Sequence, residues 1–211
     1  MAALRHVTPM IAAIVAVIAI ASVAENRQAE MQRSDHYWTA VTYAGTEHEF
    51  FEDAKDMFAS ADLVVVGRLS GMVPGRVFGE PELDDAAYYM AGALEIEEII
   101  KGGENLRQQG LTLETFTFER SAVDHLVATY PTERGLFFLR NKGTTARLLD
   151  LAPQIVAEES KYYRLVATRG LVRDLGAGPS QIGAHDEYLP ELAQGSFADV
   201  VRRVRAFAQA G

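Results

Sequence analysis

Hydrophobic positions are unevenly spread along the chain, and the longest apolar run lies near its start. The run from Ile11 to Ala21 follows the basic residue Arg5 and ends in the small residues Ser22-Val23-Ala24. A basic start, an apolar centre and small residues before a cleavage position are typical of a secretory signal peptide. We therefore expect residues 1–24 to be a signal peptide that is cleaved after Ala24.

An uncleaved membrane anchor is the alternative for the same segment. Counted from residue 7 to residue 24, the apolar run approaches the ~20 residues that a membrane-spanning helix needs. In both cases Arg5 keeps the N-terminus inside. The rest of the chain is therefore expected to be extracytoplasmic, either secreted or membrane-anchored.

The next stretch is polar and has no sustained apolar stripe. This pattern predicts a linker over residues 25–45 and a folded domain over 46–211. A capping signature, Thr46 with Glu49, precedes apolar residues at helical spacing, which predicts a helix over about 47–60.

The middle of the chain consists of short runs rich in β-branched and aromatic residues, which predict strands. Residues 71–85 are expected to form a loop between the first two strands. In the third strand the apolar positions change parity, which predicts a bulge near Glu114 or Thr115. The expected strands cover residues 63–69, 90–100, 111–118, 135–139, 146–149, 162–167 and 170–172.

Two further capping signatures mark helices among and after these strands. Ser121 with Asp124 precedes a short apolar stripe over 123–127, and Ser196 with Asp199 precedes a strong amphipathic stripe that ends near residue 208. Three strands, a short helix and then more strands are compatible with an OB-type barrel. We expect a mainly β, α+β fold: an OB-like barrel of five to six strands with an N-terminal helix and a C-terminal amphipathic helix.

Composition narrows the classes of function. The chain has 211 residues, of which 48% are hydrophobic, so one domain with a proper core is expected. Its 29 acidic and 20 basic residues give a net charge of −9, which argues against nucleic acid as a partner. The absence of cysteine excludes disulfides, a thiol nucleophile and cysteine-ligated zinc.

The strand motifs resemble a pattern found in uncharacterised exported bacterial proteins with an OB-like barrel related to netrin and TIMP-like domains. The resemblance covers about half of the chain and implies a barrel rather than a role. TIMP inhibitors chelate zinc through an N-terminal cysteine, so protease inhibition is not carried over to a chain without cysteine. The motifs are Ala61 to Gly67, Leu94 to Gly102, Gly135 to Leu139, Tyr163 to Val166, and Gly170 to Val172.

No complete catalytic motif emerges from the sequence. His48-Glu49-Phe50-Phe51-Glu52 lacks the second histidine of a zinc-protease motif. Ser121, Asp124 and His125 crowd one helical turn, where they cannot align as nucleophile, base and orienter. The glycine-rich segment 176–183 lacks the helix that a dinucleotide loop requires and is expected to be a flexible turn. We expect a protein that is not an enzyme and has no cofactor and no metal.

One loop is the candidate ligand-binding site, because it combines carboxylates with aromatic rings. In OB-type barrels the loop between strands one and two borders the ligand-binding face. Acids and rings together suit a basic protein partner or a carbohydrate. Calcium is a weaker alternative, because Pro81 stiffens the run and no later ligand follows. The candidate residues are Glu80, Glu82, Asp84, Asp85, Tyr88 and Tyr89.

Three functions remain open at this point. The leading hypothesis is an exported, non-enzymatic binding protein for a protein or envelope component. The first alternative is an extracytoplasmic hydrolase whose site combines His125 or His185 with distant carboxylates. The second is a membrane-anchored structural protein in which Arg202, Arg203 and Arg205 of the final helix matter most.

Overall fold

The computed structural model describes residues 25–41, 49–83, 85–103, 110–176, 178–181 and 189–209. The expected signal peptide or anchor at 1–24 and the Thr46 capping residue lie outside these ranges. Within them, no helix has the length and apolar character needed to cross a membrane.

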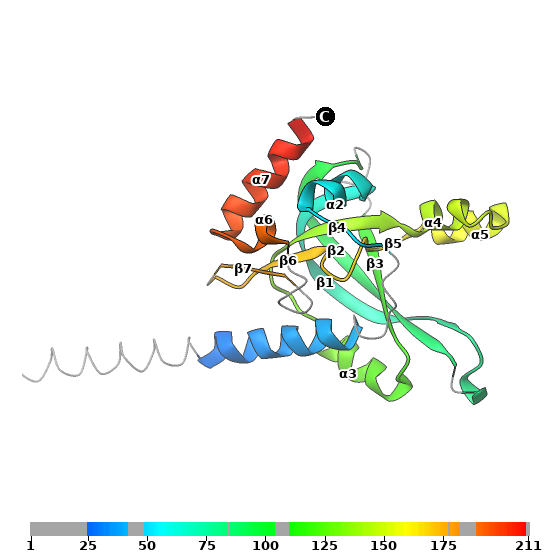
Figure 1. Ribbon diagram of the computed structural model, residues 1–211. Helices are drawn as coiled ribbons and strands as arrows, with labels where there is room; N and C mark the ends of the chain where they lie inside the picture. Colours follow the sequence, from blue (N-terminus) through cyan, green and yellow to red (C-terminus); the bar gives the residue numbers. More distant parts are fainter. Residues whose placement is uncertain are drawn as a thin grey trace, which may run out of the picture.

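A seven-stranded sheet forms the centre of the molecule (Figure 1). Its hydrogen-bonded order is β1-β2-β3-β5-β4-β6-β7, and β1 also pairs with β4. These pairings close a ring of five strands, in which β3 and β5 are parallel and the other pairs are antiparallel. The expected combination of a sheet with flanking helices is therefore confirmed at the level of a mixed α/β fold. The strands are β1 (Leu63–Phe78), β2 (Ala87–Lys101), β3 (Leu111–Thr117), β4 (Gly135–Asn141), β5 (Tyr162–Leu165), β6 (Leu171–Asp174) and β7 (Pro179–Gln181).

The first strand is much longer than its apolar run predicts, whereas β2 exceeds its predicted range by only a few residues. The expected loop over 71–85 is wrong for residues 71–78, which continue β1 and pair with β2. The sequence suggests a turn here because it contains Gly71, Pro74 and Gly75. The strand nevertheless continues, because its register with β2 shifts at two places, between Leu69 and Gly71 and between Pro74 and Val77. The connection shortens to 79–86 and contains the 3-10 helix η1 (Pro81–Leu83). It begins at Gly79, whose positive φ of 92° suits glycine.

The bulge predicted near Glu114 or Thr115 is absent, because β3 pairs with β2 in one unbroken register from residue 111 to residue 117. The change of parity arises because β3 buries side chains on both faces. Thr115 lies on the inner face and is hydrogen-bonded to the Tyr37 hydroxyl at 3.0 Å. Glu114 and Phe116 lie on the outer face, as the alternation of a strand requires.

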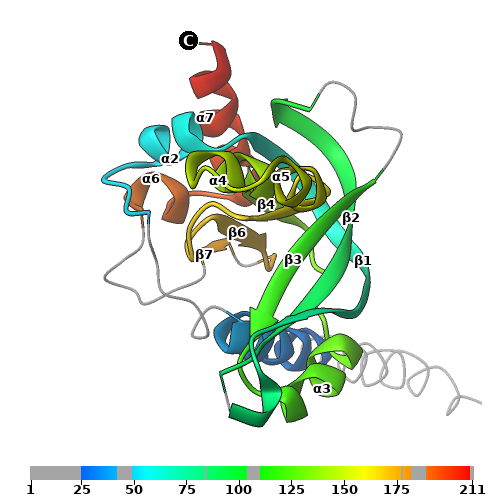
Figure 2. The same ribbon diagram turned by 90° about the vertical axis from the view of Figure 1, so that its right-hand side faces the viewer.

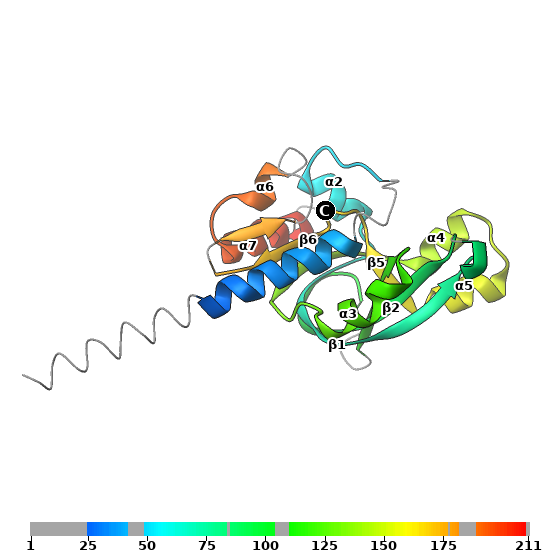
Figure 3. The same cartoon turned by 90° about the horizontal axis from the view of Figure 1, so that it is seen from below.

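The strand predicted over 146–149 is wrong, since these residues end the helix α4 (Lys142–Leu148). The Asn141 side chain caps this helix by accepting a hydrogen bond from the Gly143 N–H. With α5 (Pro153–Glu159), α4 forms a helical hairpin that projects from the body (Figures 1 and 3). Leu148 and Leu149 are exposed on it, so their apolar character reflects a surface rather than a strand.

The predicted N-terminal region also differs. Residues 25–41 form one helix instead of a linker, and its last turns bury Tyr37, Trp38 and Val41. The four-residue spacing between Tyr37 and Val41 is helical, but it is too short a stripe to stand out among polar residues. The next helix, α2 (Ala54–Ser60), begins after the cap Asp53 rather than near residue 47.

The remaining helices agree with their predictions more closely. Ser196 and Asp199 cap α7 (Phe197–Gln209) reciprocally, which confirms the capping box and the amphipathic final helix. The short helix near residue 123 is also confirmed, but Ser121 does not cap it and instead donates to Glu119. The segment expected to be a flexible turn over 176–183 contains β7. The other elements are η3 (Arg120–Ala122), α3 (Val123–Ala128) and α6 (Pro190–Ala193).

The sheet separates two hydrophobic cores. On one side α2, α6 and α7 pack on residues that include Val64, Val66 and Phe138. On the other side the N-terminal helix and α3 pack on residues that include Leu69 and Met90. Figures 1 and 2 show these two helical layers on opposite sides of the strands. The end of β1 and the start of β2 extend past α3 (Figure 1), and together with β3 they carry the site described next.

Candidate functional site

The structure does not gather the six predicted site residues at one point. Glu80, Glu82 and Asp85 are exposed in the connection between β1 and β2, and Asp84 lies outside the described residues. The Asp85 carboxylate accepts a hydrogen bond from the Glu80 backbone N–H at 2.7 Å, which closes the turn.

The two predicted tyrosines separate because they are neighbours on β2. Tyr88 is opposite Thr117 and Tyr89 is opposite Phe116 in the pairing of β2 with β3. Successive side chains of a strand point to opposite faces, so only one of the two can face the outer side. Tyr89 is the one that does, and it lies at the centre of a cluster of rings.

Four aromatic side chains form a continuous patch on the outer side of β1, β2 and β3, here called the aromatic face: Phe78, Tyr89, Phe116 and Phe118. The ring centroids of Tyr89 lie 5.4 Å from Phe78 and 5.3 Å from Phe116, and those of Phe116 and Phe118 lie 5.5 Å apart. Phe78 is 47% exposed and Phe118 is 56% exposed. Aromatic rings this exposed on neighbouring strands are typical of a contact surface.

A compact group of four charges borders the aromatic face, here called the charge cluster: Arg76, Glu114, Lys142 and Glu159. Arg76 binds Glu114 through two hydrogen bonds, of 2.9 and 2.6 Å, and Glu159 through two more, of 2.5 and 3.2 Å. The Lys142 ammonium donates to Glu114 at 2.6 Å and lies 3.4 Å from Glu159. Two cations and two carboxylates therefore neutralise one another and tie α4 and α5 to the sheet.

Burial and pairing set the ionisation of this cluster. The Glu114 side chain is only 1% exposed. Burial by itself would lower the pKa of Arg76, but its hydrogen bonds to Glu114 and Glu159 outweigh burial and raise that pKa. Burial raises the pKa of Glu159, yet the Arg76 hydrogen bond and the nearby Lys142 leave it below its usual value. Arg76 and Glu159 therefore hold their charges at neutral pH.

The cations of the cluster also pack against rings. The Arg76 guanidinium lies 4.2 Å from the Tyr162 ring centroid and 5.0 Å from that of Phe78. The Lys142 ammonium lies 4.3 Å from the Tyr89 centroid. Burial, and then the charge of Glu114, raise the pKa of Tyr89, so its phenol stays neutral at physiological pH. Cation–π contacts thus connect Phe78 and Tyr89 of the aromatic face to the charge cluster.

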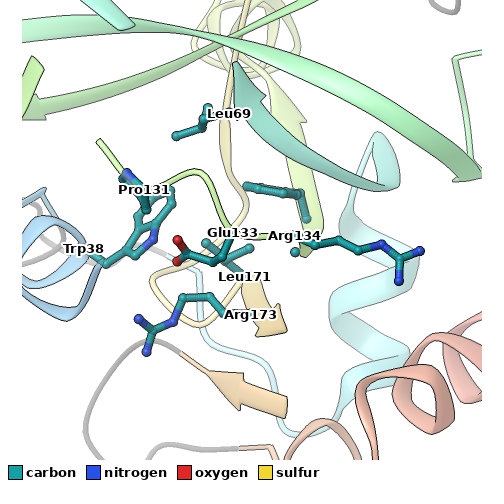
Figure 4. A pocket seen from close by; sticks show the side chains of 9 residues that line it. Trp38, Leu69, Pro131, Glu133, Arg134, Leu171 and Arg173 are labelled. Carbon is teal, nitrogen blue, oxygen red and sulfur yellow. The ribbon is translucent and has the colours of Figure 1, made fainter. Parts of the chain in front are cut away.

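A second feature is a shallow hollow beside Trp38 that has no room for an enclosed water molecule and is lined by residues that include Leu69, Phe137 and Arg173 (Figure 4). Arg173 donates to the Ser34 hydroxyl at 2.9 Å and forms an ion pair of 2.7 Å with Asp35. These contacts attach the N-terminal helix to the sheet, so the polar groups here serve its docking.

The other chemistry considered from the sequence has no support in the described geometry. His48 lies outside the described residues. His125 packs edge-on against the ring of His36, with centroids 5.8 Å apart, and Ser121 bonds to Glu119 instead. Within the described ranges, no three histidine or acidic side chains are grouped closely enough to hold a metal ion.

Most residues of the site could not be predicted from the sequence, because they lie far apart in the chain. Arg76 and Glu159 are separated by 83 positions, and only the folding of α5 against β1 brings them together. One local signal was available: Glu114 interrupts a strand of apolar residues and shares a parity with Phe116 and Phe118. A buried carboxylate in such a position requires cationic partners.

The comparisons with known proteins add no identity: the chain matches no family model, no curated protein and no solved structure.

Proposed function

We propose that this protein is an exported, non-enzymatic binding protein of the cell envelope or the secreted fraction, and that the aromatic face is its binding surface. The observation that carries the proposal is the exposure of Phe78 and Phe118 beside the half-buried rings of Tyr89 and Phe116. Exposed aromatic rings supply a large contact area, which suits recognition of a protein partner.

The strand order supports an OB-like reading of the five-stranded ring. In OB-type barrels ligands bind on the face of strands two and three, between the loop that joins strands one and two and the one that joins strands four and five. The aromatic face lies on β2 and β3, with the β1–β2 connection at one end. The α4–α5 hairpin joins β4 to β5 and contacts the same face through Lys142 and Glu159.

The state of the charged groups supports binding rather than catalysis. General acids and bases need a pKa near the working pH and a free lone pair or proton to exchange. In the charge cluster every carboxylate is paired with a cation, and the pKa shifts of Arg76 and Glu159 favour their ionised forms. These groups therefore serve to support the rings that they contact.

Export and the extracytoplasmic location rest on the N-terminal pattern of Arg5, the apolar run and Ser22-Val23-Ala24. The anchor at residues 7–24 remains the alternative to cleavage. Mass spectrometry of protein purified from cells distinguishes the two, because cleavage after Ala24 leaves Glu25 as the first residue.

Photo-cross-linking in living cells tests the binding surface. A photoreactive residue in place of Phe118 is expected to trap one envelope protein in stoichiometric amounts. In a chain with the same probe, Phe78→Ala should abolish that product. The control, Leu148→Ala with Leu149→Ala, removes exposed apolar side chains from the α4–α5 hairpin and should leave it intact. A product that survives Phe78→Ala, or no specific product at all, would contradict the proposal.

A further inference from the structure

The end of the aromatic face carries an uncompensated negative charge. Glu80, Glu82 and Asp85, here called the acidic rim, are exposed in the connection that follows Phe78 directly. In the described part of the chain none of the three takes part in an ion pair, although Asp85 accepts the Glu80 N–H. The rim is therefore available for cations from outside the molecule.

The two cations that contact the rings of the aromatic face already have partners of their own. Arg76 and Lys142 both pair with Glu114 and Glu159 inside the charge cluster. The surface thus presents exposed rings next to three free carboxylates. Because the rings and the carboxylates lie side by side, a partner that contacts both needs apolar and basic side chains within one short segment.

We propose, on the premise that the aromatic face is the binding surface proposed above, that its occupant is a segment of a partner protein in which apolar or aromatic side chains are followed closely by lysine or arginine. The apolar side chains would contact Phe78 and Phe118. The basic side chains would lie against Glu80, Glu82 and Asp85. With such a partner, the rings contact apolar side chains and the carboxylates contact basic side chains. Neither the rings nor the carboxylates are then buried against a group of the wrong polarity.

A second copy of this chain fits the surface less well. The chain carries a net charge of −9, so two copies repel each other. The basic residues of α7 are also engaged: Arg205 binds Glu98 at 2.6 Å and Arg202 binds Asp199 at 2.9 Å. An anionic membrane surface is disfavoured by the same rim, because its carboxylates repel anionic headgroups.

Peptide binding to the purified full-length chain in detergent tests the partner chemistry. The probes are immobilised peptides with one apolar core, Phe-Val-Leu-Phe, flanked by three lysines, three serines or three glutamates. The lysine-flanked peptide should bind best, and raising the salt from about 50 to about 300 mM should weaken it severalfold, because exposed charges are screened. Equal binding of the three peptides, no binding, or binding that salt does not change would overturn the inference.

Two variants separate the contributions. Replacing the rim by Glu80→Gln, Glu82→Gln and Asp85→Asn should reduce binding of the lysine-flanked peptide about tenfold, at about twofold per exposed charge, and leave the serine-flanked peptide unchanged. The control, Glu25→Gln, Glu30→Gln and Glu52→Gln, removes the same charge from exposed positions elsewhere and should have little effect. A tenfold loss of peptide binding in the control would show that overall negative charge, rather than the acidic rim, attracts the peptide, and would overturn the inference.

The outcomes also separate this inference from the proposed function. If Phe78→Ala removes the cellular cross-link while the rim variant changes neither that product nor peptide binding, the aromatic face binds a partner without basic residues and only the inference fails. If Phe78→Ala leaves the cross-link in place, the proposed function itself fails. Self-association in sedimentation experiments that the rim variant strengthens would identify a second copy as the occupant instead.

Discussion

Glu114 illustrates how much of this molecule depends on one buried charge. Its side chain is 1% exposed in the middle of β3, and both Arg76 and Lys142 bind it. A buried carboxylate is costly by itself, but removal of one partner from a buried pair is costlier, because the other charge is then unpaired. The residue thus ties β1, β3 and α4 to one another.

We expect Glu114→Gln to lower the free energy of unfolding by about 3 kcal/mol, since Arg76 and Lys142 would keep only Glu159 as a counter-ion. Urea denaturation followed by circular dichroism measures this change. Glu95→Gln is the control, because the Glu95 pair with Arg68 is about half exposed and should contribute under about 1 kcal/mol. Equal losses in the two variants would mean that the cluster behaves as an ordinary surface pair.

Asp199 gives a prediction about pH at the start of α7. The Ser196 hydroxyl and backbone N–H donate to its carboxylate, and these hydrogen bonds lower its pKa from 3.8 to about 2. A lowered folded pKa stabilises the helix start fully above the unfolded pKa, and this stabilisation is lost as the pH falls toward about 2.

Ser196→Ala should raise the pKa of Asp199 toward 3.8, because the hydroxyl that donates to the carboxylate is removed. An NMR titration of the Asp199 side-chain carboxyl carbon measures the value directly. The unchanged chain, titrated in parallel, is the reference. A pKa that stays near 2 in the variant would show that the Ser196 backbone and Arg202 suffice.

At the scale of elements, the strands were easier to predict than their ends. Runs such as Leu63 to Leu69 identify β1 because β-branched residues favour a pleated, buried surface. The outer half of β1 was not predicted because Gly71, Pro74 and Gly75 interrupt its apolar pattern. The strand persists there because β2 supplies hydrogen bonds along its whole length, with local shifts of register.

The α4–α5 hairpin was missed for a different reason. Its apolar residues Leu148 and Leu149 suggest a buried strand, whereas Asn141 and Gly143 start a helix instead. Gly143 is essential to the hairpin because α4 and the end of α5 approach closely there. An added Cβ would overlap the Ser160 side chain and lie 2.8 Å from the Ser160 Cα.

Gly143→Ala should therefore destabilise the protein by about 1 to 3 kcal/mol through overpacking. Thermal unfolding followed by circular dichroism provides the measurement. Gly71→Ala is a matched control, because the closest atom to its added Cβ would be 3.9 Å away, which is ordinary contact. If the Gly143→Ala and Gly71→Ala variants are equally stable, Ser160 can move away from the added methyl group without a loss of unfolding free energy.

At the scale of the whole molecule, the N-terminal helix completes one of the two cores. It buries Tyr37 and Trp38 to 0% and 2% exposure, and Tyr37 also reaches Thr115 and Met72. Each large buried side chain contributes about 1.5 to 3 kcal/mol, which is a large share of the 5 to 15 kcal/mol that stabilises a typical domain.

A chain that begins at residue 45 should thus unfold at a much lower urea concentration than one that begins at residue 25, or fail to fold cooperatively. Circular dichroism during urea denaturation tests this, with the chain from residue 25 as the control. Equal urea midpoints for the two chains would show that the N-terminal helix adds nothing to the stability of the domain, as expected for a linker.

The sequence by itself determined the features that depend on neighbouring residues. The capping box of Ser196 and Asp199, the alternation of β2 and the β-branched run of β1 are local, since each follows from side chains a few positions apart. The net charge and the absence of cysteine also came directly from composition. The signal segment belongs to this group as a prediction, because its signature is contiguous.

The tertiary structure alone decided everything that joins distant residues. Closure of the five-stranded ring, docking of the polar N-terminal helix and assembly of Arg76, Glu114, Lys142 and Glu159 all require contacts between segments far apart in the chain. The physical reason is that burial fixes the partner of each side chain. A strand's alternation states which residues share a face, but only packing decides which other elements cover that face.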